Sequence, residues 1–115
     1  MESNFSFGQI KLVDLNPTKG VEMNKVRPCV ILSPEEMNDS LRTIIVAPIT
    51  STLRAIPTRV LVKATLDNNL DHDSYVVLDQ IKTLDRMRII QDLGHISENE
   101  KRQISETLCE MFSYE

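Results

Sequence analysis

Short apolar segments separated by polar turns run through most of this 115-residue chain, and this pattern constrains its fold more than any other feature. Apolar runs bounded by Pro, Gly, Asn and Asp are typical of strands. Six strands are expected, over Phe7–Leu15, Cys29–Leu32, Thr43–Ile49, Arg59–Ala64, Tyr75–Leu84 with a possible bend near Asp79-Gln80, and Arg88–Leu93. Since no crossover helices lie between these segments, the pattern excludes a doubly wound parallel sheet and favours a small barrel or sandwich.

The last segment of the chain changes to helical spacing. Ser97 and Glu100, three residues apart, form a capping-box pattern that starts a helix. Apolar residues then recur on one face of that helix, at Ile104, Leu108, Met111 and Phe112. A short helix is also indicated over Ser33–Asn38, with Ser33 as its N-cap and Pro34 in the first helical position. The chain is therefore expected to be one domain over residues 1–115, mainly β with α (α+β).

The charge of the chain is unevenly spread. Its formal net charge is −4 and its pI about 5.2, which disfavours unspecific binding to nucleic acid. Between Pro17 and Lys63, however, seven basic and four acidic residues give a net charge of +3, so the remainder carries −7. This basic middle suits a local anion site, although charge alone favours an ordinary solvated surface.

Several classes of protein are excluded by what the chain lacks. Its longest apolar stretch, Ile44–Ile49, is far shorter than the roughly 20 residues of a membrane-spanning helix, and the N-terminus has no secretory signal. Two cysteines without a Cys/His cluster predict a reduced cytosolic protein without a zinc site. Two Tyr and three Phe are too few for a stacking platform on RNA. No P-loop, GxGxxG, GxSxG or HExxH motif is present, and His72 and His95 are expected at the surface.

Three side chains near strand ends are suited to binding an anion. Arg27 precedes Pro28, which lacks an amide hydrogen and should start its strand or lie at an edge. A guanidinium held there suits bidentate contact with phosphate, and the alternative is a surface salt bridge. Thr50 and Ser51 follow a buried run, where hydroxyls face a ligand or, more commonly, close the turn.

Acidic and amide side chains supply the remaining candidates. Glu22 lies in the loop over Thr18–Lys25 and is expected to be exposed. Asp79 and Gln80 interrupt an apolar segment, so they should be partly buried and must pair with other groups. This makes them more informative than charges in loops.

Several blocks of the chain, taken together and in order, resemble one known family. They are Gly8-Gln9-Ile10, Leu15–Glu22 (LNPTKGVE), Val26–Pro34 (VRPCVILSP), Val46–Ser51 (VAPITS), Leu78–Ile81 (LDQI) and Thr83–Asp85 (TLD). With these blocks at this spacing over about residues 7–113, the chain resembles the MazF/PemK toxins, which are the ribonuclease components of bacterial toxin–antitoxin pairs.

The resemblance implies a small SH3-like β-barrel with a C-terminal helix, and cleavage of single-stranded mRNA at short sequences without a metal or cofactor. In the family's scheme a 2′-hydroxyl attacks its own phosphorus, leaving a 2′,3′-cyclic phosphate and a 5′-hydroxyl. Carried over by motif, the catalytic residues are Arg27 of the RP pair, Thr50 of the PITS block, the loop residue Glu22 and Asp79 of the LDQ block. The residues expected to bind RNA are Thr18, Lys19, Lys25, Ser51, Arg54 and Gln80.

Chemistry assigns Arg27 and Thr50 to stabilising the transition state before any proton transfer, because guanidinium pKa values exceed about 12 and a threonine hydroxyl is a poor base. Asp79 is proposed as a base in some members of the family. Its place between apolar residues favours an anchoring role here. The loop departs from the family pattern at Val21 and over Met23-Asn24-Lys25, so the cleavage sequence is not predicted.

The resemblance also implies partners. They are a second copy of the chain and a cognate antitoxin whose acidic or amphipathic C-terminal segment occupies the RNA groove. DNA would be contacted only through the antitoxin complex, and no membrane is involved. Two other functions stay open, a CcdB-like toxin that binds DNA gyrase and a non-catalytic SH3-like interaction domain.

Overall fold

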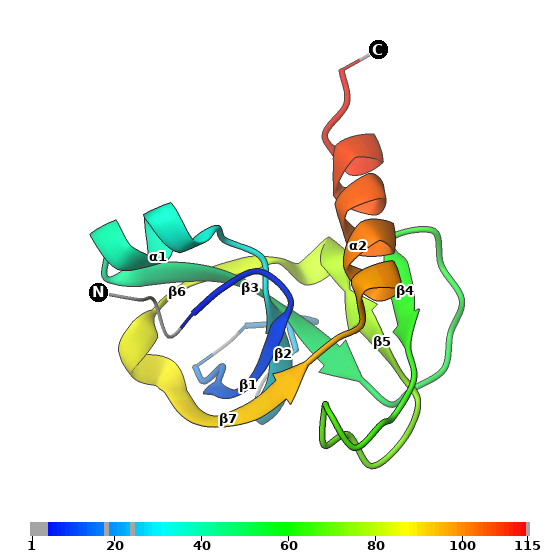
Figure 1. Cartoon of the computed structure of the whole chain (residues 1–115), viewed down its shortest axis with the longest axis horizontal. Coiled ribbons are helices and arrows are strands. Elements are labelled where there is room, and N and C mark those ends of the chain that lie inside the picture. The colour runs from blue at the N-terminus through cyan, green and yellow to red at the C-terminus, as the bar shows by residue number, and fades with distance from the viewer. Residues whose placement is uncertain (1–4, 18, 24, 115) are drawn as a thin grey trace.

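The computed structural model describes residues 5–17, 19–23 and 25–114, and over them the chain forms a strongly coiled antiparallel sheet with a helix at its C-terminal end (Figure 1). Its strands are β1 (Gln9–Asp14), β2 (Val26–Ile31), β3 (Thr43–Thr50), β4 (Arg59–Val62), β5 (Ser74–Val77), β6 (Lys82–Asp85) and β7 (Ile89–His95). The helices are α1 (Glu35–Ser40) and α2 (Glu98–Met111), with short 3-10 turns η1 (Leu78–Gln80) and η2 (Arg86–Arg88). The predicted fold class, mainly β with a C-terminal helix, is confirmed.

Strand β3 organises the sheet because it pairs with three neighbours. The strand order is β4-β5-β3-β2-β1-β7, and β6 also pairs with β3. The first half of β3, Thr43 to Val46, pairs with β6, whereas its end, Ile49 and Thr50, pairs with β5. The sheet therefore divides at β3 and coils. The first residues of β2 and the last residues of β3 lie where these two strands no longer pair.

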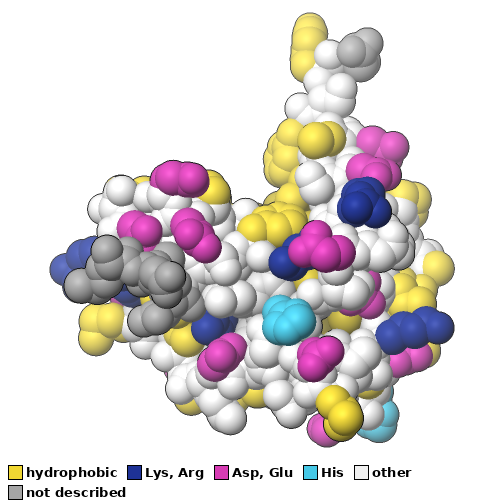
Figure 2. Space-filling model, viewed as in Figure 1, with side chains coloured by type: hydrophobic (Ala, Val, Ile, Leu, Met, Phe, Trp, Pro, Cys, Tyr) yellow, Lys and Arg dark blue, Asp and Glu magenta, His cyan; other side chains and the backbone are white. Residues whose placement is uncertain are grey.

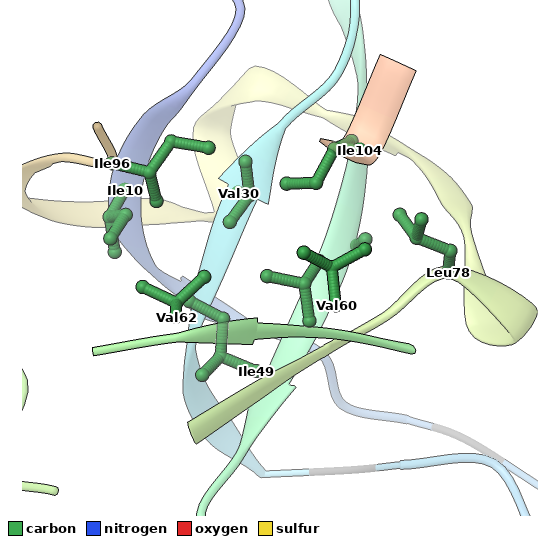
Figure 3. Packing of buried hydrophobic residues seen from close by; sticks show 10 residues of the cluster. Ile10, Val30, Ile49, Val60, Val62, Leu78, Ile96 and Ile104 are labelled. Carbon is green, nitrogen blue, oxygen red and sulfur yellow. The ribbon is translucent and has the colours of Figure 1, made fainter. Parts of the chain in front are cut away.

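Two apolar clusters fill the two sides of the coiled sheet. In β2, Val30 belongs to the larger cluster and Cys29 and Ile31 belong to the smaller one, as the alternation of a strand requires. Helix α2 closes the larger cluster through Ile104, which is fully buried and points toward Val30 and Val60 (Figure 3). The predicted capping box of α2 is confirmed, since Ser97 and Glu100 each accept the other's backbone N–H.

The short helix is present, but its predicted cap is wrong. Pro34, not Ser33, is the N-cap residue of α1, and no side chain caps the helix. The hydroxyl of Ser33 instead donates to Oδ1 of Asn38 at 2.5 Å and accepts the Ile45 N–H at 3.0 Å. Ser33 and Asn38 are both buried, so their polar groups must form hydrogen bonds within the protein. The Ser33 hydroxyl is used in this way and is not available to cap the helix.

The expected single strand over residues 75–84 is two strands, which is why seven are found in the described residues rather than six. The turn η1 separates β5 from β6 at Asp79 and Gln80, where a bend was expected. The chain has to cross there because β5 and β6 pair with different halves of β3.

Pro28 was expected either to start its strand or to lie at an edge, and the second expectation is confirmed. Pro28 lies inside β2, opposite Leu12 of β1, and the pairing of β2 with β3 begins only at Cys29. One side of β2 is therefore open at Pro28, and the missing amide hydrogen costs no hydrogen bond to β3.

Strand β7 continues past the expected end at Gly94 to His95. The backbone of Gly94 has a φ of +128°, opposite Ile10 where the register with β1 shifts. Glycine adopts this conformation readily, so the strand can pass through a bulge instead of ending.

Candidate functional site

Arg27 and Thr50 lie at the point where β2 and β3 separate. Cys29 pairs with Pro48, and continuing this antiparallel register by two residues places Arg27 opposite Thr50. Both are half-buried, and Arg27 and Ser51 line one hollow together with Ile49 and His72. The Thr50 hydroxyl accepts the Thr52 N–H at 3.2 Å, so it also closes the turn after β3. The continued register thus sets Thr50 opposite Arg27, and Ser51 lines a hollow together with Arg27. We call this hollow, defined by Arg27 and Ser51, the arginine hollow.

A second hollow, the carboxylate hollow, is lined by Val21, Glu22, Asp79, Gln80, Ile81 and Lys82. Oε1 of Glu22 accepts the backbone N–H of Lys19 at 3.0 Å and lies 3.5 Å from Nζ of Lys82. The backbone hydrogen bond from Lys19, with the nearby charge of Lys82, holds the pKa of Glu22 below its ordinary value, so Glu22 is ionised at neutral pH.

Gln80 joins the β1–β2 loop to η1. Its Oε1 accepts the backbone N–H of Met23 at 2.7 Å. The expectation that Asp79 and Gln80 must pair is therefore confirmed for Gln80, whose partner is a loop 57 residues away in the chain.

Asp79 is bound by Arg59, the first residue of β4, and by Thr58, which precedes that strand. It accepts hydrogen bonds from the Thr58 hydroxyl at 3.0 Å and from the Arg59 guanidinium at 3.2 and 3.3 Å. Partial burial would raise the pKa of Asp79, but the hydrogen bonds from Arg59 and Thr58 outweigh it and hold the pKa below its ordinary value. A carboxylate held in this way is suited to anchoring η1 and poorly suited to taking up a proton.

Cys29 is buried in β2, two residues after Arg27. Burial raises the pKa of the Cys29 thiol to about 12, and the positive charges of Arg27 and Lys82 both oppose that rise. A cation from each hollow therefore lies close enough to the same buried sulfur to act on it. The thiol stays protonated and serves as a core residue rather than a nucleophile.

The structure brings together most, but not all, of the predicted residues. Lys19 and Lys25 are exposed on the β1–β2 loop that carries Glu22, and Thr18 lies outside the described residues. Arg54 is exposed on the β3–β4 loop and lines neither hollow. His72 and His95 are exposed, as expected, and His72 also lines the arginine hollow.

Sequence reasoning missed Lys82. It follows Gln80 by two residues and is a charged residue within an apolar segment, which was the available signal. It was overlooked because its partner, Glu22, is 60 residues away in the chain.

Over residues 5–17, 19–23 and 25–114, no group of three or more His, Cys, Asp and Glu side chains is arranged to hold a metal ion. Within the same described part of the chain, no helix is both long and apolar enough to cross a membrane.

Sequence comparisons match the chain to one protein family. The model of the family described as PemK-like, MazF-like toxin of type II toxin–antitoxin system matches residues 6–112. A curated relative, the endoribonuclease MazF of Staphylococcus saprophyticus, is 34% identical over 103 residues, which cover 88% of this chain and 85% of that protein.

Solved structures share the fold. The Mycobacterium tuberculosis toxin MazF-mt6 superposes with a TM-score of 0.77 at 27% identity, covering 93% of this chain and 98% of the other. MazF from Deinococcus radiodurans has a TM-score of 0.80 at 23% identity, covering 93% and 94%. The coiled sheet with its terminal helix is therefore a known architecture.

Proposed function

The chain belongs to the PemK-like, MazF-like toxins of type II toxin–antitoxin systems, and we propose that it is an endoribonuclease that cleaves single-stranded mRNA at short sequences without a metal ion. The observation that carries the proposal is the position of Arg27 where β2 and β3 separate, opposite Thr50 in the continued register and in one hollow with Ser51. It is supported by the ionised Glu22 in the neighbouring hollow. Because the substrate is mRNA, the activity belongs in the cytoplasm.

The proposed reaction uses the nucleic acid, these side chains and solvent. The 2′-hydroxyl oxygen gives its proton to a carboxylate as it bonds to the adjacent phosphorus, the bond from phosphorus to the 5′ oxygen breaks, and the leaving oxygen takes up a proton from solvent. The products are a 2′,3′-cyclic phosphate and a 5′-hydroxyl. Arg27 stabilises the extra negative charge on the phosphorane, and Thr50 donates a hydrogen bond to it.

Of the two candidate carboxylates, Glu22 is the better proton acceptor for the attacking hydroxyl. Its contacts with the described residues all fall on Oε1, which leaves Oε2 for the substrate. Asp79, by contrast, uses both oxygens on Thr58 and Arg59. The low pKa of Glu22 keeps it in the form that accepts a proton, although it lowers the basicity available for the transfer.

A homodimer and an antitoxin complete the proposal. The apolar stripe of α2 ends at Phe112, which is 72% exposed, and Figure 2 shows hydrophobic side chains gathered along this helix. Strand β4 lies at the edge of the sheet, and an unpaired strand edge and an exposed apolar patch are both surfaces that another chain can bind. A cognate antitoxin with an acidic or amphipathic C-terminal segment would compete with RNA for the cations of the site, and DNA would be bound only by that complex.

The experiment that tests the function is incubation with a long single-stranded RNA in EDTA, followed by mapping of the 5′ ends. We expect discrete cleavage sites whose 5′ ends carry hydroxyls and whose 3′ ends carry cyclic phosphates. Activity only after a divalent cation is added would contradict the metal-independent scheme. RNA left intact under both conditions would contradict the nuclease and favour the gyrase-binding or non-catalytic alternatives.

Asp79→Asn separates anchoring from catalysis. As an anchor, Asp79 should tolerate the isostere, with cleavage close to wild type. As a general base it should not, and cleavage would be nearly abolished with RNA affinity unchanged. Measuring both quantities for the folded variant decides between them.

The same variant has a consequence for stability. The folded-state pKa of Asp79 lies below the ordinary value of 3.8, so the carboxylate stabilises the fold above that pH and loses this contribution as the pH falls through the lower folded pKa. We therefore expect the wild-type free energy of unfolding to fall more steeply than that of Asp79→Asn below about pH 4. Glu106→Gln, which removes an exposed carboxylate from α2, is the control. Parallel pH profiles for wild type and Asp79→Asn would contradict the anchoring contacts.

A further inference from the structure

Lys82 is a cation with a weakly compensated charge. Its side chain is only 18% exposed, and the described residues give its ammonium one partner, Oε1 of Glu22 at 3.5 Å. An ammonium has three hydrogens to donate, and a lysine this buried is ordinarily paired more closely. Glu22 is itself 51% exposed, so solvent weakens the pair further. The ammonium can therefore donate further hydrogen bonds to a group bound in the carboxylate hollow, which Lys82 lines.

The strand register places Lys82 on the same face of the sheet as Arg27. Lys82 pairs with Val46, and Val46 pairs with Ile31 on the other side of β3. Directly opposed residues point to the same face, as do residues two apart in one strand. Lys82 therefore shares a face with Ile31, Cys29 and Arg27 of β2. Strand β3 lies between the two strands, and Arg27 is four residues before Ile31, the residue in line with Lys82.

We propose that Lys82 binds a backbone phosphate of the RNA, in place of Glu22, on the same strand whose scissile phosphate contacts Arg27. This inference rests on the proposed function and adds a binding residue to it. A single-stranded nucleic acid carries one negative charge per nucleotide, so two cations on one face can bind two phosphates of one strand. On binding RNA, Lys82 exchanges its 3.5 Å contact with the half-exposed carboxylate of Glu22 for a charge-assisted hydrogen bond to the phosphate.

Lys82 is not needed to hold the β1–β2 loop, which is the other role its contact with Glu22 suggests. The loop is fastened at Met23 by Gln80, with a hydrogen bond of 2.7 Å. Glu22 is separately held by the Lys19 N–H at 3.0 Å, and the Lys25 N–H donates to Oδ1 of Asn16 at 3.0 Å. These contacts are all shorter than the ion pair, so removing Lys82 leaves the loop fastened.

The test measures binding apart from cleavage. The mapped cleavage sequence is synthesised with 2′-O-methyl groups at the attacked position, so that the oligonucleotide cannot undergo 2′-hydroxyl attack. Its dissociation constant is measured over a range of salt for wild type, Lys82→Gln, Glu22→Gln and Lys101→Gln. Lys101 is the matched control because it pairs with an exposed glutamate, Glu98, at 3.2 Å, away from both hollows.

We expect Lys82→Gln to weaken binding about tenfold or more at low salt, the loss typical of one hydrogen bond between charged groups. The slope of log affinity against log salt should fall by about 0.7, the value for one phosphate contact on a single strand. The loss is read from binding of the uncleavable oligonucleotide, which measures the phosphate contact of Lys82 apart from any change in the cleavage rate. Lys101→Gln should match wild type in both measurements.

Glu22→Gln distinguishes phosphate binding from loop positioning. If Lys82 binds phosphate, removing its carboxylate partner leaves binding of the oligonucleotide unchanged or tighter. The proposal is overturned if Lys82→Gln binds like wild type, or if Glu22→Gln shows the same loss of affinity as Lys82→Gln with an unchanged salt slope. Failure of wild type to cleave RNA would instead count against the proposed function, and the binding comparison would then be made with a single-stranded RNA of arbitrary sequence in place of the mapped one.

Discussion

Arg27→Ala should lower the rate of RNA cleavage by about 10²–10³ while the protein stays folded. Losing one preorganised contact to developing charge typically costs this much in rate. The cost in stability should be small, about 1 kcal/mol or less, because Arg27 is only half-buried and lies where β2 leaves β3. Single-turnover cleavage at saturating RNA measures the first effect, and chemical denaturation measures the second.

Two further variants make this result specific. Arg27→Lys should recover only part of the activity, because an ammonium cannot reproduce the planar fork of a guanidinium on phosphate. Arg102→Ala removes an exposed arginine from α2, outside both hollows, and should cleave like wild type. Cleavage at the wild-type rate by folded Arg27→Ala protein would show that the arginine hollow is not the site of the reaction.

Gly94→Ala is expected to destabilise the fold severely, by about 3–5 kcal/mol. The added Cβ would lie 1.9 Å from the backbone oxygen of Asp67 and 2.9 Å from its carbonyl carbon. That oxygen also accepts the His95 N–H at 3.1 Å, so β7 and the Asp67 loop cannot move apart without losing a hydrogen bond. With φ at +128°, the backbone itself is strained for any residue with a side chain. Urea denaturation of the purified variant measures the loss.

Gly20→Ala is the matched control for this prediction. Gly20 also has a positive φ, +61°, but a Cβ there would meet nothing within 4 Å. Only the conformational cost of about 1–2 kcal/mol remains. If Gly94→Ala were no less stable than Gly20→Ala, the close approach of the Asp67 backbone to β7 would be wrong.

The elements that depend on local chemistry were predictable. Helix α2 begins where Ser97 and Glu100 form the capping box, and its apolar stripe points Ile104 into the core. The interruption at Asp79 and Gln80 was visible as a polar pair within an apolar segment. The cap of α1 was not predictable in the same way, because Ser33 is buried and its hydroxyl is used by Asn38 and β3.

By itself, the sequence determined the strand-forming segments, the terminal helix, the family, and the residue types that carry the proposed chemistry, because these depend on neighbours in the chain or on motifs of a few residues. Only the tertiary structure decided how those residues are used. Asp79 is held by Arg59, 20 residues away, and Glu22 faces Lys82, 60 residues away. Such contacts depend on β3 pairing with β5 at one end and β6 at the other. Strand order and register are set by the packing of the whole core, which no local pattern of side chains encodes.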